Sequence, residues 1–579
     1  MPLPEFTGTL GLKRASHLLR RATFGATKAQ IDSFAALTPA QAINELFHQT
    51  LPDAPLPIDP KTGSEWVLSG VTDANSDDLD ELFKRWFIGQ MLSAGVSPAL
   101  SLPYAARERL VFFLHTHFTT IGSTVGNSRS LYFQNALFRL FALDGLSADP
   151  EVNIKTLTVK ISVDNAMLQL LNGNENVKGS VNENYGRELL ELYTIGRGLE
   201  GSLPASPGPG DYIMYTEQDV KAAARVLSGW AIDDTFATLD VDTQLPRGKV
   251  KGSATNASAH DNDPKQFSVR FGNAVIQGDA ALMPGGNPTE ESALDEIVQL
   301  VDMIYAKPET ARNICWKIYR FFVYAPHTTE ESVALDGTII AEMANTLVAN
   351  NYKILPVIEN LLRSVHFYEA TAGTVTDDNF GGIIKSPLDL VIQSVRFFGI
   401  PVTDMNTSAD EFYEQTGEVL EYVRSQAMNF YEPYDVAGYD AFHQFPVYHR
   451  YWITPNTLAN RYAFVRSLIT ASEPGMLKAN VYEFVRDNIP NATAADAGQL
   501  VMMVADYILP VTDNLTFDDA ADDLSGLTAK RLNYFKERFL QTFDEAYWTT
   551  RWNEGAGDLR DQLEYLFNAI MQSPEYQLA

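Results

Sequence analysis

The sequence predicts a mainly α-helical protein, one large multi-helix body with an insertion of loops and short strands around residues 231–286. Apolar residues recur at three- and four-residue spacing through most of the chain, which is the period of a helix with one buried face. The insertion differs because short β-prone pieces alternate there with Gly, Asn and Asp. We therefore expect three regions, 1–230, 231–286 and 287–579, with the two helical regions packed as one continuous body.

The first region is predicted to consist of helices with recognisable start and stop signals. A helix over 12–24 ends at Gly25, and Thr27 is placed to cap the next one. Thr38 and Pro39 supply an N-cap and a first-turn proline for a third helix. Further helices are expected over residues 77–93, 103–119, 129–143 and 162–172, and after the Thr216-Glu-Gln-Asp219 capping box.

Helices are also expected to dominate the region after the insertion. The segment from Asn429 to Tyr451 is the exception, because it is rich in aromatic and turn residues and contains His443 and His449. We interpret this density as loop packing, with stacking on a sugar ring as the alternative. The predicted helices before it cover 291–306, 308–324, 329–350, 353–368 and 387–398, and helices continue after it to the last residue.

The central feature of the sequence is the stretch from Asn182 to Gly196, which we predict to be a single helix. At about 100° per residue, its polar residues fall within one arc of roughly 100°, and apolar residues take most of the remaining circumference. The helix is therefore expected to be buried on most sides and to carry one polar ribbon. This ribbon consists of Asn184, Arg187, Glu188 and Glu191.

The charged groups of the ribbon must be paired or must face a wet cleft, and both alternatives are open at this point. In a structural network, Arg187 pairs with Glu183 and Glu191, which lie four residues away on either side. Structural networks of this kind perturb carboxylates in the same way as functional sites do. The ribbon alone therefore does not distinguish packing from chemistry.

Several histidines are candidate metal ligands. His115 and His117 resemble a metal-binding pair, but residues two apart on a helix point about 200° apart and cannot reach one ion. We favour His117, which ends a Phe-rich run near a predicted turn, over the alternative of a satisfied core histidine. In the insertion, His260, Asp261 and Asp263 form a loop able to ligate Zn²⁺, Mn²⁺ or Ca²⁺. A solvated Asx-turn is the simpler interpretation there.

The acidic composition restricts the classes of partner. The 579-residue chain has 73 acidic and 44 basic side chains and a formal net charge of −29, so nucleic acid is not expected as a general partner. A basic or metal-bearing pocket is still able to bind an anion locally. The one cysteine, Cys315, excludes an intramolecular disulfide and is expected to be a buried thiol, because it lies in an apolar helical pattern.

Neither a transmembrane span nor a secretory signal peptide is expected. No window approaches ~18 apolar residues, and the first residues lack a basic start and an apolar core. As given, the chain is expected to be cytoplasmic unless a leader was removed. Phosphate-binding loops, dinucleotide fingerprints, the Gly-x-Ser-x-Gly elbow and His-Glu-x-x-His are absent from the sequence, so no common motif specifies a reaction.

Nine stretches, in order along nearly the whole chain, resemble one bacterial family, the domain of unknown function 1800 (DUF1800). They are His17–Gly25, Phe113–Phe118, Asp164–Leu168, Asn182–Gly196, Tyr215–Val220, Ala224–Trp230, Lys385–Leu388, Pro433–Tyr439 and Trp452–Thr454. The resemblance implies no assigned activity. It implies that relatives are often exported and are encoded beside a second uncharacterised exported family, which makes that protein a candidate partner. This chain shows no leader, and its compartment stays open.

The first functional hypothesis is a metal- or carboxylate-assisted hydrolase whose polar cleft is lined by residues 182–196. One glutamate of the ribbon ligates a divalent cation or stays ionised, while the other acts as general base with a pKa raised by its neighbour. The arginine of the ribbon orients an anionic group of the substrate. The predicted catalytic residues are Glu188, Glu191 and Arg187, the substrate-binding residues are Asn182, Asn184, Arg225 and Arg21, and the ligands of one divalent metal ion are His117, Glu188, His260 and Asp261.

The alternative hypothesis is a non-catalytic binding or assembly protein, associated with the cell surface. In that case the polar ribbon is a structural ion network, and the aromatic region 429–452 engages a partner or a glycan.

Overall fold

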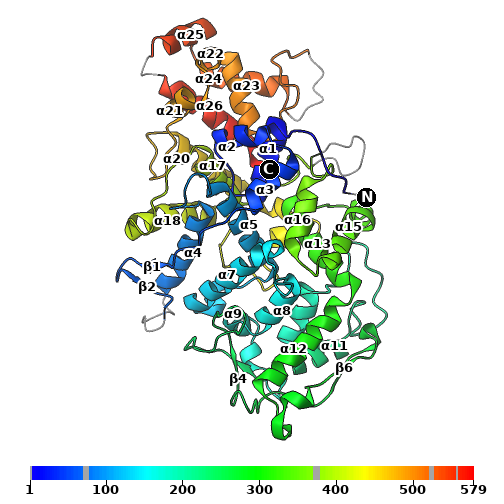
Figure 1. The fold of residues 1–579 in the computed structure, drawn as a ribbon. Helices are drawn as coiled ribbons and strands as arrows, with labels where there is room; N and C mark the ends of the chain where they lie inside the picture. Colours follow the sequence, from blue (N-terminus) through cyan, green and yellow to red (C-terminus); the bar gives the residue numbers. More distant parts are fainter. Residues whose placement is uncertain (1–2, 69–76, 369–378, 521–526, 556–558) are drawn as a thin grey trace.

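Helices form most of the structure, and the few strands are short, which confirms the prediction of a mainly α-helical protein (Figure 1). The computed structural model describes residues 3–68, 77–368, 379–520, 527–555 and 559–579. A single cluster of buried apolar side chains runs from Leu10 to Tyr576. No helix of the described residues combines the length and the apolar character that a membrane span requires. The division into three regions stays a prediction.

The N-terminal helices begin where their caps predict. Thr27 and Gln30 form a capping box at the start of α2, and Thr38 and Gln41 form one at the start of α3. Gly25 adopts a left-handed backbone with φ of +91°, and there it passes against Gln393. The helices of this part are α1 (Gly11–Ala22), α2 (Lys28–Ala35), α3 (Pro39–Phe47), α4 (Asp77–Met91), α5 (Ser101–His117), α6 (Gly122–Val125) and α7 (Ser128–Ala142).

The prediction of one continuous helix over 162–172 is wrong. The structure has two helices here, α8 (Ile154–Ser162) and α9 (Asn165–Leu170). Asp164 separates them, because its side chain accepts a hydrogen bond of 2.9 Å from the main-chain N–H of Met167 and so caps α9.

The segment 231–286 contains short strands and 3₁₀ turns and no α-helix, as the sequence predicts. Its strands belong to two-stranded antiparallel sheets. Trp230 pairs with Val250, and Lys265 pairs with Ile276. The strands are β3 (Trp230–Ala231), β4 (Lys249–Val250), β5 (Lys265–Gln266) and β6 (Val275–Ile276); a third sheet, earlier in the chain, joins β1 (Ile58–Asp59) and β2 (Ser64–Glu65).

The remaining helices complete two ends of an elongated molecule. Figure 1 shows α21 to α26 gathered at one end beside α1 and α2, and α11, α12, β4 and β6 near the other. Contacts between α1 and α23 tie the two ends of the sequence together. The helices are α11 (Glu217–Val226), α12 (Glu290–Tyr305), α13 (Pro308–Phe322), α14 (Thr329–Leu335), α15 (Ala341–Ala349), α16 (Ile354–Arg363), α17 (Pro387–Phe397), α18 (Ala409–Ser425), α19 (Asp440–His443), α20 (Pro455–Ile469), α21 (Val481–Asn488), α22 (Asn491–Ala495), α23 (Ala497–Ile508), α24 (Ala529–Leu540), α25 (Glu545–Asn553) and α26 (Arg560–Met571).

The stretch predicted as one α-helix over 182–196 is α-helical only in α10 (Asn184–Glu188) and then becomes a π-helical turn, Leu189–Tyr193. The hydroxyl of Thr194 donates to the carbonyl of Leu189 at 2.6 Å, and the N–H of Gly196 donates to Leu190 at 2.8 Å. A π turn takes an extra residue, so side chains after Glu188 leave the positions that an α-helical wheel gives them. π turns recur at functional sites.

α10 lies directly on the backbone of α11. A Cβ atom at Gly186 would lie 2.8 Å from the nitrogen of Ala224 and 2.9 Å from the oxygen of Val220. Only a glycine permits this approach, which brings the polar ribbon of α10 against the start of α11.

We expect Gly186→Ala to lower the free energy of unfolding by about 1–3 kcal/mol, because the added methyl group forces α10 away from α11. Gly337→Ala is the matched control, since nothing lies within 4 Å of a Cβ at that helical glycine. The control should be neutral or slightly stabilising. Chemical denaturation measures both, and equal effects of the two substitutions would contradict the proposed close packing.

Candidate functional site

The two asparagines at the start of α10 serve the local backbone. The side-chain oxygen of Asn182 accepts a hydrogen bond of 3.0 Å from the N–H of Asn184. The side-chain amide of Asn184 donates to the carbonyl of Leu171 at 3.3 Å. Both residues are half-buried. These bonds position the start of the helix, and the substrate-binding role of the two asparagines stays a prediction.

Arg187 is held by three groups. Its Nη2 lies 2.8 Å from Glu217 and 3.6 Å from Glu183, and its Nη1 donates to the hydroxyl of Tyr212 at 3.0 Å. The pair with Glu183 is the one expected from four-residue spacing. The guanidinium is therefore engaged within the protein.

Glu191 does not form the expected pair with Arg187, because it follows the change to a π turn. It pairs with Arg197 instead, at 2.7 Å, and accepts a hydrogen bond of 2.9 Å from the hydroxyl of Tyr215. Arg187 and Glu191, two charged residues of the polar ribbon, thus both have partners within the protein.

Glu188 is the exception in the ribbon. Its half-buried carboxyl group makes no hydrogen bond and no ion pair with any residue that the structure describes. Burial raises the pKa of Glu188 to about 7; the charges of Glu191 and Asp435 also raise it, and those of Arg187 and Arg197 lower it. A carboxyl group of this kind is able to exchange a proton near neutral pH.

Tyr193, an electrostatic neighbour of Glu188, and His117 are buried and also have polar atoms without partners in the described part of the chain. The hydroxyl of Tyr193 and both ring nitrogens of His117 make no hydrogen bond of good geometry. Burial raises the pKa of Tyr193, and the charge of Glu188 adds to the rise. Burial holds the pKa of His117 well below its usual value; Lys317 lowers it too, while the main chain at Tyr193 opposes the shift.

The two histidines of α5 point apart, as expected for residues two apart on a helix. The ring of His115 stacks on Tyr431, with centroids 3.9 Å apart, and its Nε2 lies 3.3 Å from the hydroxyl of Tyr439. His117 packs against Phe118 on another side. Of the two histidines, His117 is the one whose pKa is affected by Lys317 and by the main chain at Tyr193.

Lys317 of α13 and His443 of α19 complete the surroundings. The Nζ of Lys317 donates to the carbonyl of Leu192 at 2.5 Å, and burial together with Arg320 lowers the pKa of Lys317 to about 7. Burial also lowers the pKa of His443, against the opposing effect of Asp435. Among the residues described, no group makes a hydrogen bond to Nε2 of His443, and its nearest carboxylate, Asp440, is 3.8 Å away.

These groups form one cluster, which we call the Glu188 site. Its members come from α5, α10 with its π turn, α13 and the aromatic segment around α19, and they range from buried His117 to exposed Asp435. Glu188 is an electrostatic neighbour of Tyr193 and Asp435, and His443 is one of Asp435 and Lys317. His117 is a neighbour of Lys317 and of the main chain at Tyr193. The Glu188 site consists of Glu188, Tyr193, His117, Lys317, Asp435 and His443.

Sequence reasoning found two members of this site, Glu188 and His117. Asp435 and His443 had a signal, because both lie in the aromatic segment and Asp435 lies in a stretch that resembles the family. Lys317 had none, since one lysine in an apolar helical pattern usually reaches solvent. The described residues contain no group of three or more His, Cys, Asp or Glu arranged to hold a metal ion, and the predicted metal stays a prediction.

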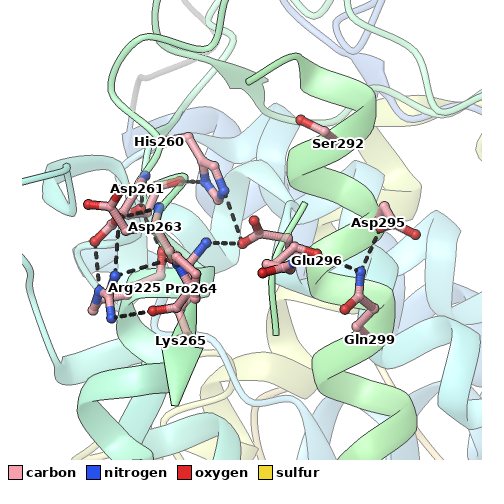
Figure 2. A network of polar contacts seen from close by, with 12 residues as sticks. Arg225, His260, Asp261, Asp263, Pro264, Lys265, Ser292, Asp295, Glu296 and Gln299 are labelled. Carbon is pink, nitrogen blue, oxygen red and sulfur yellow. Dashed lines mark hydrogen bonds and ion pairs between the residues drawn. The ribbon is translucent and has the colours of Figure 1, made fainter. Parts of the chain in front are cut away.

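The other predicted ligands and one predicted substrate-binding residue lie in a separate network (Figure 2). Arg225 pairs with Asp261 at 2.7 Å. His260 accepts or donates at both ring nitrogens, at 2.9 Å from the carbonyl of Ser228 and 3.1 Å from Glu296. Lys265 forms a close ion pair with the same carboxylate. Since each predicted residue here has a protein partner, this network is best explained by structure.

Arg21, the remaining predicted residue, lies on α1 among other elements. Its Nη2 donates to the carbonyl oxygens of Asn379 at 3.0 Å and Ala579 at 2.6 Å. It lines a cavity together with Arg20, Arg109 and Arg320. The structure therefore brings Arg21 together with other arginines and not with the ribbon of α10.

We expect Lys265→Met to destabilise the protein by about 3 kcal/mol, because it leaves the fully buried carboxylate of Glu296 without its cation. The double substitution Lys265→Met with Glu296→Gln should be less damaging than the single one, since no charge is then left unpaired. Denaturant unfolding of the four proteins in this cycle measures the coupling. Additive effects would show that the pair is not a structural unit.

Comparison with known proteins adds a family and no activity. The family model for a protein of unknown function, DUF1800, matches residues 17–578. No curated protein and no solved structure matches the chain. Because the family match covers nearly the whole sequence, the chain belongs to the DUF1800 family of proteins of unknown function.

Proposed function

We propose that this protein is a hydrolase in which Glu188 is the general base. One observation carries the proposal: the half-buried carboxyl group of Glu188 has no partner among the described residues, and its pKa is raised to about 7. A general base works best when its pKa lies near the operating pH. Arg187 and Glu191 are both held in ion pairs within the protein. This supports positioning roles for both, in place of the catalytic roles expected for them.

The other members of the Glu188 site supply the remaining groups that hydrolysis requires. In this reaction the ionised carboxylate takes a proton from a water molecule, and the water oxygen attacks the electrophilic centre of the substrate. Negative charge then develops on a substrate oxygen. Tyr193 keeps its proton because its pKa is raised, and Lys317 is part protonated near pH 7, so both are able to donate to that oxygen.

In the metal-assisted form of the proposal, Glu188 and His117 bind a divalent cation. The crowding of Glu188 with Glu191 and Asp435 is the observation that favours it, because a cation would relieve their repulsion. This form predicts stoichiometric metal in the purified protein that Glu188→Gln removes. His260 and Asp261 are left out of it, since both are bound by protein groups.

The non-catalytic alternative is favoured by a different observation. Arg187, Glu191, Arg225 and Asp261 are all engaged in ion pairs inside the protein. A binding or assembly protein needs such pairs for packing alone. It gives no reason, however, for an unpartnered carboxyl group at Glu188.

Activity is tested with a panel of chromogenic esters, phosphate esters, glycosides and peptides. Glu188→Gln should lower kcat/KM by about 10²–10⁴-fold on any substrate turned over, because the amide cannot accept the proton. The wild-type kcat/KM should rise with pH through about 7, as Glu188 ionises. Glu191→Gln is the matched control, since it removes a carboxylate from the same turn. Its kcat/KM should still rise with pH, but at a lower pH, because the charge of Glu191 raises the pKa of Glu188. A pH profile that survives in Glu188→Gln would refute the role of Glu188.

Stability gives a test that needs no substrate. Because the folded-state pKa of Glu188 is raised, its contribution to stability is fully present below the ordinary pKa of a glutamate and is lost as pH rises through about 7. Glu188→Gln should therefore stabilise the protein above pH 7, by about 1–2 kcal/mol after allowance for solvent screening, and have little effect near pH 4. Glu191→Gln should destabilise it, because Arg197 loses the negative charge of its ion-pair partner. Thermal unfolding at both pH values distinguishes the hydrolase from the structural alternative. Destabilisation by both substitutions at both pH values would favour the structural alternative.

A further inference from the structure

A groove between α20, α24 and α26 has no part in the Glu188 site. Its volume is about 350 Å³, against about 30 Å³ for each of the two cavities beside α1. Pockets for small ligands have volumes of about 300–1,000 Å³, so the groove is large enough for a small molecule. We call it the tyrosine pocket and define it by these lining residues: Tyr462, Arg531, Tyr534, Arg538, Tyr565 and Gln572.

The tyrosine pocket lies apart from the helix that carries Glu188. Figure 1 shows α24 and α26 at the end of the molecule where the C-terminal helices gather, and α11 near the other end. α10, the helix of Glu188, packs against α11. A ligand in the tyrosine pocket therefore gives the protein a second function, and this function does not rest on the role of Glu188.

Two helices that pack against each other form most of the pocket. α24 contributes Arg531, Tyr534 and Arg538, which share one face of the helix because they are three and four residues apart. Tyr565, Asn568 and Gln572 have the same spacing along α26 and just after it. Because the lining side chains come from packed helices, the pocket exists before a ligand binds, as is usual for small-molecule sites.

Three tyrosines, one from each helix, give the pocket its aromatic surface. Tyr534 is 43% exposed and Tyr565 is 47% exposed, while Tyr462 is half-buried. None of the three hydroxyl groups makes a hydrogen bond to a residue that the structure describes. A tyrosine offers a flat apolar ring with a polar tip. Such rings can stack on the C–H face of a sugar, and their hydroxyl groups can bond to its hydroxyl groups.

Positive charge at the pocket is only partly paired. No acidic side chain of the described residues lines it, in a chain with 73 acidic residues. Arg531 pairs with Glu575 at 3.1 Å. Arg538 is exposed and forms no ion pair with any described residue. The same holds for Arg466, whose Nη1 lies 3.5 Å from the side-chain oxygen of Gln572. Two guanidinium groups are therefore left to pair with an anionic group of a ligand.

Further hydrogen-bond donors are present in the lining. Arg531 donates to Glu575 through Nε, and its two Nη atoms make no hydrogen bond within the described part of the chain. Burial raises the pKa of Tyr462; Glu575 adds to the rise, while Arg461 and Arg531 oppose it. The hydroxyl of Tyr462 therefore keeps its proton and can donate to a ligand.

We propose that the tyrosine pocket binds a saccharide that carries an acidic group, a carboxylate or a sulfate. The tyrosine rings pack on the sugar ring, and the guanidinium groups of Arg538 and Arg466 bind the acidic group. A neutral sugar would give no role to the two unpaired arginines. An inorganic anion would give none to the three tyrosine rings. A ring with an acidic group uses both.

Binding to the full chain is measured by ligand-observed NMR titration at constant ionic strength. The acidic ligands are glucuronate, galacturonate and the sulfate esters of glucose and galactose. Glucose and galactose supply the same rings without the charge, and acetate and sulfate supply the charge without a ring. At least one acidic sugar should bind about tenfold more tightly than its neutral parent and than the free anion.

The pattern of binding names the acidic group. Binding of a uronate alone identifies a carboxylate, binding of a sulfate ester alone identifies a sulfate, and binding of both assigns the site to either group. Equal affinity for the neutral parent sugar or for the free anion would overturn the proposal. So would a lack of binding by every acidic sugar.

A charge variant locates the acidic group. Arg538→Gln should lower the affinity for the acidic sugar about tenfold and leave the affinity for its neutral parent unchanged, because it removes a charge-assisted donor. Lys530→Gln is the matched control. Lys530 is exposed on the same helix, has no ion pair with a described residue and does not line the pocket. Its loss should change the affinity by less than about twofold.

A ring variant locates the sugar. Tyr534→Ala should lower the affinity for acidic and neutral sugars alike, by about three- to tenfold, because it removes a stacking surface. Tyr547→Ala is the matched control, since Tyr547 is 46% exposed on α25 and does not line the pocket. Both side chains are exposed, so both variants should fold, and thermal unfolding checks this. Equal affinities of the pocket variants and their controls would show that the sugar binds elsewhere and overturn the proposal.

Discussion

A charged group stays in a protein interior only when it is paired, hydrogen-bonded or made neutral by a shifted pKa. Most buried charges of this protein obey that constraint through pairs between distant parts of the chain. Lys265 and Glu296 are both fully buried and bonded to each other, and His260 shares the same carboxylate. Arg187 joins α10 to the start of α11 through Glu217 in the same way. These pairs hold the strand insertion and the polar ribbon in place.

Pairing is incomplete at Glu188, whose carboxyl group has no partner among the described residues. At Glu188 a carboxyl group lies among other carboxylates, which favours the protonated form near neutral pH. A proton can settle this imbalance.

Much of the fold could be predicted because its signals are local. Thr27 and Thr38 cap the helices that they were expected to cap, and Asp219 accepts a hydrogen bond from the N–H of Thr216 at the expected start of α11. In each case a side-chain oxygen reaches an N–H two or three residues away whatever the tertiary structure is. The break at Asp164 was missed because the apolar spacing continues through it, although an aspartate is itself a cap signal. The π turn after Glu188 left no local signal.

The sequence by itself determined the mainly helical class, the position of the strand insertion, the family and the central place of residues 182–196. It also identified Glu188 and His117. Only the tertiary structure decided that Glu191 pairs with Arg197, that Arg225 and His260 are engaged elsewhere, and that Asp435 lies near Glu188. The physical reason is the separation along the sequence over which each kind of interaction acts. Caps and helical periodicity act over a few residues, whereas the partner of a buried charge is chosen by packing between segments that lie tens to hundreds of residues apart.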